Sequence, residues 1–261
     1  MRIKTQKEID ILREGGHKLA AIMDLLIPMV KPGVTTEVLE KAAIKEMERL
    51  GCKPSFLGYK PSFNSKKFPT ALCLSINHEI VHTPALPARI LNEGDILGID
   101  MGLVYKNMYT DMARTVPVGK INKEATKLLN TTQEALDKAI ASLNLNDTLY
   151  AIGEAVEKVA KANNCSIIRE LTGHGVGHEI HEDPHVFNFR DKESKKTKIV
   201  KGMVIAIEPM LALGKSDIVL ADDGWTYETE DSSLAAQFEN TVAIGYDGKV
   251  EILTPTKWKF R

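Results

Sequence analysis

The chain has 261 residues, 43% of them hydrophobic, and a formal net charge of -1 at pH 7. This is enough to bury the core of one domain or of two fused halves, and near neutrality argues against a nucleic acid or an anionic membrane as the main partner. Three cysteines without a Cys-x-x-Cys motif indicate a reducing compartment, so we expect a cytoplasmic protein. Because Asp24 and Pro28 interrupt the apolar run 20–30 and no apolar signal core precedes it, neither a signal peptide nor a membrane span is predicted.

Helical patterns open each half of the chain. Thr5 and Glu8 form a capping box before an apolar stripe with helical spacing, which contains Ile9, Leu12, Leu19, Ile22, Met23 and Leu26. A second helix is expected after Thr35 and should stop at Gly51, and two more are expected at about 123–143 and 147–163.

Strand-like segments follow each pair of helices, at about 71–117 and again from 164 to the end, where Asp247-Gly248 predicts a hairpin turn. Two helices followed by strands, twice over, predict an α+β fold with two similar halves, about 1–120 and 121–261, within a single domain 1–261. The halves share no evident sequence identity, so the duplication is a hypothesis from the order of elements.

Four acidic residues interrupt the apolar strand-like runs: Asp100, Asp111, Glu208 and Glu239. Carboxylates are rarely buried unless they are paired or bind a metal. If Lys106-Asn107 is a two-residue hairpin turn, Asp111 lies opposite Gly102 and one diagonal step from Asp100 on the same face. The two aspartates can then hold a common ion.

The glycine-rich segment 173–184 carries His174, His178 and His181. Its glycines disfavour a helical zinc site and favour imidazoles presented from a strand or loop. One of these histidines with the four carboxylates suits two divalent cations, of cobalt, manganese, iron or zinc, because the ions balance the carboxylate charge. Taken alone, each acid would be interpreted as a solvated turn or strand-end residue, and His174 as a structural histidine.

Five motifs carry a resemblance over nearly the whole chain: Gly-Ile-Asp-Met-Gly, Tyr-Thr-Asp-Met-Ala, Gly-His-Gly-Val-Gly, Ile-Glu-Pro-Met and Gln-Phe-Glu-Asn-Thr. Together they resemble type I methionine aminopeptidases, metallopeptidases of the pita-bread fold. The resemblance implies two pseudo-symmetric halves whose antiparallel sheet is covered by helices, forming one catalytic domain. It implies that Asp100 binds one metal, that His174 and Glu208 bind the second, and that Asp111 and Glu239 bridge both.

The resemblance also implies an activity and its catalytic residues. A metal-activated hydroxide would attack the first peptide bond of nascent polypeptides, which releases the N-terminal methionine when the second residue is small. Glu208 would also shuttle the proton to the leaving amine, while His82 and His181 would contact the substrate without binding metal. His78 is rejected in favour of His82, because the family's histidine follows Glu-x-Val.

The methionine pocket is less firmly defined. The family resemblance places Tyr59, Cys73, Ile180 and Trp225 there, although each could be plain core. The segment 53–70 is longer and differently spaced than in the commonest bacterial form, and Ile180 replaces a frequent aromatic residue. The outer wall therefore remains open among Phe56, Phe63 and Phe68.

Two rival functions remain. Xaa-Pro aminopeptidases and prolidases share these ligands but usually bring a separate amino-terminal domain, and a non-catalytic binding protein on this fold would be expected to lose ligands. We expect a monomer. The charged segment 190–198 is interpreted as a solvated loop, with a transient ribosome contact as the alternative. His17, His178 and His185 receive no role.

Overall fold

The computed structural model describes residues 1–61 and 66–260. Its first half begins with helix α1 (Gln6–Leu26), a short 3-10 turn η1 (Ile27–Met29) and helix α2 (Thr36–Arg49). The side chain of Thr5 accepts a hydrogen bond from the backbone amide of Glu8, whose own side chain accepts one from the amide of Thr5, which confirms the capping box. All six residues of the predicted apolar stripe of α1 are fully buried.

A long antiparallel hairpin forms the centre of the first half. Its strands are β4 (Ile96–Tyr105) and β5 (Met108–Pro117), and β1 (Lys53–Pro54) and β2 (Cys73–Ile76) pair with β4. Lys106 and Asn107 form the turn with φ values of 48° and 63°. Gly102 pairs with Asp111, as predicted from the turn, because a two-residue connection determines the register of both strands.

The second half begins with helices α3 (Lys123–Ala141) and α4 (Tyr150–Ala162), close to the predicted ranges. Ten strands follow, with a 3-10 turn η2 (Glu193–Lys196) before β9: β6 (Ser166–Ile167), β7 (Gly173–Gly175), β8 (Glu182–Val186), β9 (Val204–Ile207), β10 (Met210–Ala212), β11 (Ile218–Leu220), β12 (Tyr227–Thr229), β13 (Ala235–Gln237), β14 (Asn240–Ile244) and β15 (Val250–Ile252). Asp247 and Gly248 lie in the turn between β14 and β15, as predicted.

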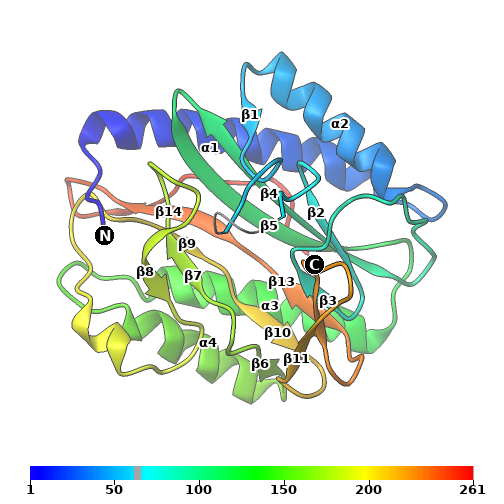
Figure 1. Ribbon diagram of the computed structural model, residues 1–261. Coiled ribbons are helices and arrows are strands. Elements are labelled where there is room, and N and C mark those ends of the chain that lie inside the picture. Colours follow the sequence, from blue (N-terminus) through cyan, green and yellow to red (C-terminus); the bar gives the residue numbers. More distant parts are fainter. Residues whose placement is uncertain (62–65, 261) are drawn as a thin grey trace.

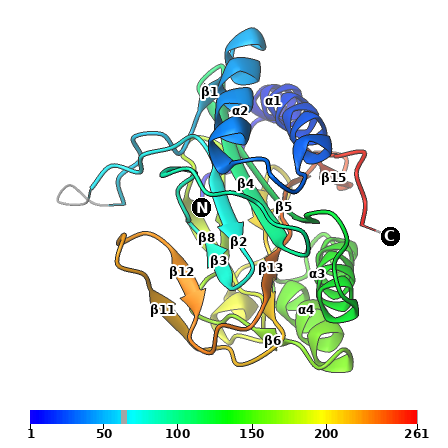
Figure 2. The same cartoon turned by 90° about the vertical axis from the view of Figure 1, so that its right-hand side faces the viewer.

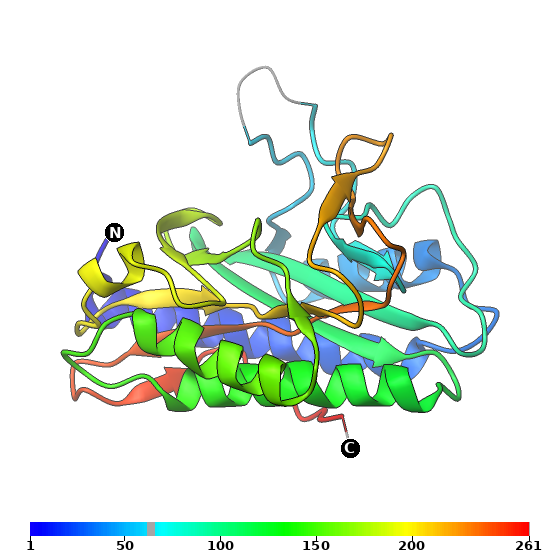
Figure 3. The same ribbon diagram turned by 90° about the horizontal axis from the view of Figure 1, so that it is seen from below.

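The second-half strands form three antiparallel groups. Five of them follow the order β15-β14-β9-β7-β8, and three others follow β13-β10-β6. Strand β11 pairs with β12, and β12 pairs with β3 (Glu79–Val81), which belongs to the first half. Helices α1, α3 and α4 lie on one side of the strands, while β11, β12 and the segments 55–61 and 66–68 project on the other side (Figures 1, 2 and 3). The predicted α+β class is confirmed.

The two halves have separate cores and a polar seam. One apolar cluster packs α1 and α2 against β2, β4 and β5, and a second packs α3 and α4 against strands of the second half. Along the seam the hydroxyl of Thr241 donates to the backbone oxygen of Asp111 (2.8 Å) and accepts from its amide (2.9 Å), and Glu239 donates its amide to the oxygen of Ala113 (2.9 Å). These bonds hold β5 against β14 and against Glu239, which directly precedes it. Within the described residues, no helix is long and apolar enough to cross a bilayer.

Candidate metal centre

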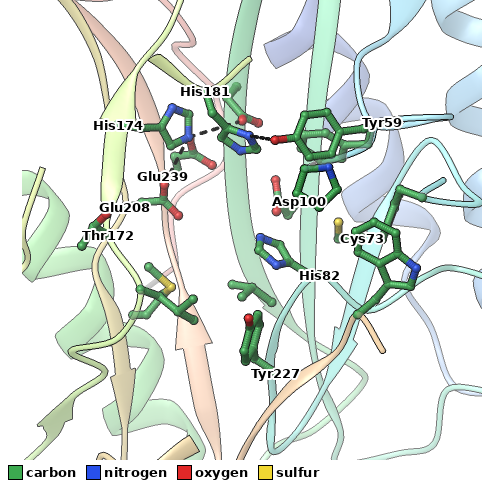
Figure 4. Close-up of a pocket in the computed structure, with 18 of the residues that line it drawn as sticks. Tyr59, Cys73, His82, Asp100, Thr172, His174, His181, Glu208, Tyr227 and Glu239 are labelled. Carbon is green, nitrogen blue, oxygen red and sulfur yellow. Dashed lines mark hydrogen bonds and ion pairs between the residues drawn. The ribbon is translucent and has the colours of Figure 1, made fainter. Parts of the chain in front are cut away.

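The β4–β5 hairpin presents two buried carboxylates on one face. Asp100 lies in β4 and Asp111 in β5, with exposures of 8% and 3%. Asp111 lies opposite Gly102, two residues along β4 from Asp100, so both aspartates point to the same face of the hairpin. The register of the hairpin therefore puts both carboxylates over the same cavity, as Figure 4 shows for the labelled Asp100.

Three more donors come from the second half. His174 lies in β7, Glu208 directly follows β9, and Glu239 lies between β13 and β14; their exposures are 9%, 8% and 1%. Strand β9 pairs with β7 on one side and with β14 on the other, which brings these positions together. All five predicted ligand residues line one cavity (Figure 4).

The donor atoms fall into overlapping groups, each spanning at most 4.8 Å. One group contains Asp100, Asp111 and Glu239, and another contains His174, Glu208 and Glu239. A third joins Asp111 and His174 to His181, so geometry alone would admit His181 as a ligand. Because the first two groups share Glu239, they have the arrangement that two neighbouring ions with a bridging carboxylate require.

Unsatisfied buried oxygens test whether divalent ions fit. Within the described chain, one oxygen each of Asp100, Asp111 and Glu239 is buried without a hydrogen-bond partner. Buried polar atoms are normally paired, and a bound cation would pair all three. Nδ1 of His174 lies 2.9 Å from the backbone oxygen of Gly175, which fixes the tautomer in which Nδ1 donates and Nε2 offers a free lone pair. That Nε2 lies 3.4 Å from Oε1 of Glu208.

Polar residues behind the donors hold them in place. The amide side chain of Gln237 donates to Oε2 of Glu208 (2.9 Å), and that of Asn188 donates to the backbone oxygen of Glu208 (2.9 Å). Arg114 is 3% exposed and donates to the backbone oxygen of Glu239 (2.5 Å) and to Oδ1 of Asn240 (3.0 Å). These three residues were missed from sequence, although an arginine inside the apolar run 112–116 was a usable signal of a buried charge.

The carboxylates repel one another when no cation is present. Burial raises the pKa of Asp111 to about 7. Burial first, and then the charges of Asp111 and Glu208, raise the pKa of Asp100 well above its ordinary value. Burial and the charge of Asp111 do the same to the pKa of Glu208. Burial lowers the pKa of His174 to about 3, so its imidazole is neutral at pH 7 and able to bind a metal.

The two predicted non-ligand histidines also project into the cavity (Figure 4). His82 follows β3 with a φ of 61°, and its ring lies edge-on to Tyr227 with centroids 5.8 Å apart. His181 lies in the loop before β8, with Nδ1 2.8 Å from the hydroxyl of Tyr59 and its ring 4.6 Å from that of His174. His78 does not line this cavity, and its Nε2 lies 3.8 Å from Glu228.

An aromatic wall closes one end of the cavity, which has a volume of about 390 Å³. Phe68 lies edge-on to Trp225 and to Phe56, with ring centroids 5.1 Å and 6.4 Å apart, and Tyr59 and Cys73 complete the lining there. Ile180 packs against Phe56, Phe68 and Cys73 from behind and is not among the lining residues. Phe63 lies outside the described residues.

A further part of the cavity lining was not foreseen from the sequence. Its lining includes Leu171, Thr172, His185, Met210, Leu220 and Tyr227. His185, which received no role, is the cross-strand partner of His174, and its Nδ1 lies 3.1 Å from the hydroxyl of Thr172. The register between β7 and β8, which includes a bulge, brings His185 to His174 and Thr172, so no local signal could have identified His185.

Known proteins share this architecture along the whole chain. The model of metallopeptidase family M24 matches residues 10–245. A methionine aminopeptidase of Aquifex aeolicus is 43% identical over 255 residues, which are 97% of this chain and 98% of the relative. Methionine aminopeptidase 1 of Bacillus subtilis is 36% identical over 96% of this chain and 98% of its own.

Solved structures agree. The crystal structure of methionine aminopeptidase from Thermotoga maritima superposes with a TM-score of 0.91 at 34% identity, covering 97% of this chain and 99% of that one. The prolidase of Pyrococcus furiosus, at 22% identity and a TM-score of 0.72, shares the fold, with 98% of this chain matching 66% of the prolidase. The predicted pita-bread fold is confirmed.

Proposed function

The chain belongs to metallopeptidase family M24 and is a hydrolase that removes N-terminal methionine with the help of divalent metal, and from this we propose how its residues divide the work. Asp100, Asp111, His174, Glu208 and Glu239 would hold two divalent ions, with Asp111 and Glu239 as the ligands common to both. The observation that carries this proposal is the set of buried carboxylate oxygens without partners in the described chain. Metal analysis of protein purified without added cobalt should give two ions per chain and identify the metal.

Bound ions would supply a water acidic enough to attack a peptide carbonyl at neutral pH. Glu208 would carry the proton to the leaving amine, because it lines the cavity and its Oε2 is held in place by the amide of Gln237. Burial and the nearby His181 lower the pKa of His82 to about 4, so at pH 7 it offers a neutral N–H rather than a competing charge. His82 and His181 would donate to the carbonyl oxygen as it becomes an oxyanion.

We propose that the aromatic wall receives the methionine side chain. Phe56, Phe68, Cys73 and Trp225 offer apolar and sulfur contacts to a flexible thioether, and Tyr59 closes the pocket through its bond to His181. The second residue of the substrate would then lie beside His82, where only a small side chain fits. We therefore expect the enzyme to cleave Met-Ala and Met-Ser peptides in preference to Met-Leu peptides.

Peptide choice tests this function directly. Metal-loaded protein should cleave Met-Ala-Ser, spare Met-Leu-Ser and leave Ala-Pro intact. Cleavage of Ala-Pro would favour a prolidase-like activity, and the absence of metal-dependent cleavage of any peptide would favour a binding protein. His82→Ala should slow Met-Ala-Ser cleavage strongly while metal content stays at the wild-type level, because His82 is proposed as a donor and not as a ligand.

We further propose a cytoplasmic, single-domain monomer that acts on nascent chains. Three buried free cysteines support a reducing compartment, and Trp258 packs against both apolar cores, which supports one domain over 1–261. In the segment 190–198, Arg190 pairs with Glu154 (3.1 Å) and Lys196 with Glu193 (2.6 Å). Internal pairing of these charges supports a solvated loop over a ribosome contact. Ribosome co-sedimentation would test for that contact, and light scattering would test the monomeric state.

A further inference from the structure

The loop that carries His181 is held by a buried ion pair to the beginning of the chain. Nζ of Lys4 lies 2.7 Å from Oε2 of Glu182, and the side chains of this pair are 1% and 6% exposed. Glu182 directly follows His181 in the sequence. A buried ion pair is costly unless every polar atom is satisfied, so its presence here calls for a reason other than stability.

Glu182 folds the loop through its second oxygen. Oε1 accepts hydrogen bonds from the backbone amides of His178 (2.6 Å) and Glu179 (3.1 Å), which closes the turn that ends at His181. Nζ of Lys4 also donates to the backbone oxygen of Arg2 (3.1 Å). Both carboxylate oxygens are therefore committed, one to the loop and one to the chain beginning.

The stem of Lys4 supports the same loop by contact. Gly177 has a φ of +144°, and a Cβ on it would lie 2.3 Å from Cε of Lys4, so the stem occupies the space that a side chain would need. A second tether lies nearby, where Nε2 of His178 is 2.8 Å from Oε1 of Glu8. The stem of Lys4 thus fills the space beside Gly177, and its ammonium neutralises Glu182 and holds the loop in place. That loop ends at His181, whose imidazole faces Tyr59 and His174.

We propose that Lys4 and Glu182 are positioning residues for His181, so that the beginning of the chain determines where this imidazole stands over the metal centre. The proposal rests on the proposed role of His181 at the substrate. Without the ion pair, Glu182 is no longer held where its Oε1 accepts hydrogen bonds from the two backbone amides. The turn then opens, and His181 loses its hydrogen bond to the hydroxyl of Tyr59. Metal binding should survive, because neither Lys4 nor Glu182 contacts any of the five proposed ligands.

A double-mutant cycle on kcat/KM for Met-Ala-Ser tests this coupling. Lys4→Met keeps the stem and removes the charge, and it should lower kcat/KM by about 10- to 100-fold, the cost of misplacing a catalytic group by about 1 Å. On a His181→Ala background the same change should have almost no further effect. Arg13→Met is the matched control: Arg13 joins α1 to Glu251 in the second half (2.5 Å) and touches no part of the loop, so its kcat/KM should stay unchanged in both backgrounds.

Equal losses from Lys4→Met with and without His181 would overturn the proposal, because the pair would then act on the fold alone. If Lys4→Met does not fold, Glu182→Gln enters the same cycle, since it keeps an acceptor for the two amides. If the wild-type protein cleaves no peptide, the proposed function fails separately. The imidazole proton resonances of His181 then decide, because they should shift in Lys4→Met and stay fixed in Arg13→Met.

Discussion

The metal end and the aromatic end of the cavity are built in different ways. At the metal end, donors come from or next to paired strands of both halves, and hydrogen bonds between the Thr241 hydroxyl and the backbone of Asp111 join β14 to β5. At the aromatic end, the wall comes from irregular segments around Phe56, Phe68 and Trp225, which are held by ring contacts. The metal end can therefore keep its geometry when the wall changes, and the two should be separable by mutation.

The largest effect is expected at the metal end. Asp111→Asn keeps the shape of the side chain but removes one charge and one good metal oxygen, so kcat should fall by about 100-fold or more, as for loss of other active-site electrostatic contacts. The fold should persist, because burial already disfavours the ionised form of this carboxyl. Circular dichroism measures whether the fold persists, and kcat at saturating metal measures the loss of turnover. Asp10→Asn, on the exposed face of α1, is the charge-matched control, and near-native turnover in Asp111→Asn would show that the bridge is assigned wrongly.

Metal removal should destabilise the same end in a pH-dependent way. The folded pKa of Asp111 is about 7, above its ordinary value of 3.8, so the metal-free folded state holds more protons than the unfolded state between these values. Stability of the metal-free protein should therefore fall as pH rises from about 4 to about 7. The gain in Tm on adding manganese or cobalt should grow over the same range. A gain in Tm that is flat or declines with pH would contradict the raised pKa of the buried Asp111 carboxyl.

A change in the aromatic wall should leave the metal end intact. Trp225→Ala removes the ring that packs edge-on against Phe68, so kcat/KM for Met-Ala-Ser should fall by about 10- to 100-fold, in line with the roughly 1.5–3 kcal/mol of burying a large apolar side chain. Metal content and the Tm gain on metal addition should match the wild type. Loss of metal in this variant would show that the two ends are coupled after all.

The smallest effect on kcat/KM is expected for a change at Gly102, which lies between the two ends. A Cβ there would be 2.0 Å from Oγ of Ser55 and 3.0 Å from both Phe56 and Ile180. Gly102→Ala should displace the wall by a few tenths of an ångström and lower kcat/KM several-fold, with metal content unchanged. Within the described chain Oγ of Ser55 has no hydrogen-bond partner, so Ser55→Ala should be nearly neutral alone and should restore part of the activity when added to Gly102→Ala. Failure of this rescue would place the effect elsewhere.

Much of the fold was predictable because its signals are local. The capping box at Thr5 and Glu8, the second helix between Thr35 and Gly51 and the Lys106-Asn107 turn each depend on residues a few positions apart, and each is confirmed. The turn also determined which face of the hairpin Asp111 shares with Asp100. Acids inside apolar runs indicated buried charges, and the structure brings all of these acids to one cavity, although their roles as ligands stay a prediction.

The rest depended on contacts between segments far apart in the chain. The bulged register of β7 with β8 places His185 opposite His174, and Arg114 lies behind Glu239 only because β5 meets the second half along the polar seam. Nothing local in Lys4 announces its pairing with Glu182, 178 positions away. Periodicity and turn chemistry determine how one segment folds and which side it buries. Packing over the whole molecule decides which buried faces meet. That packing places the aromatic wall and the loop of His181.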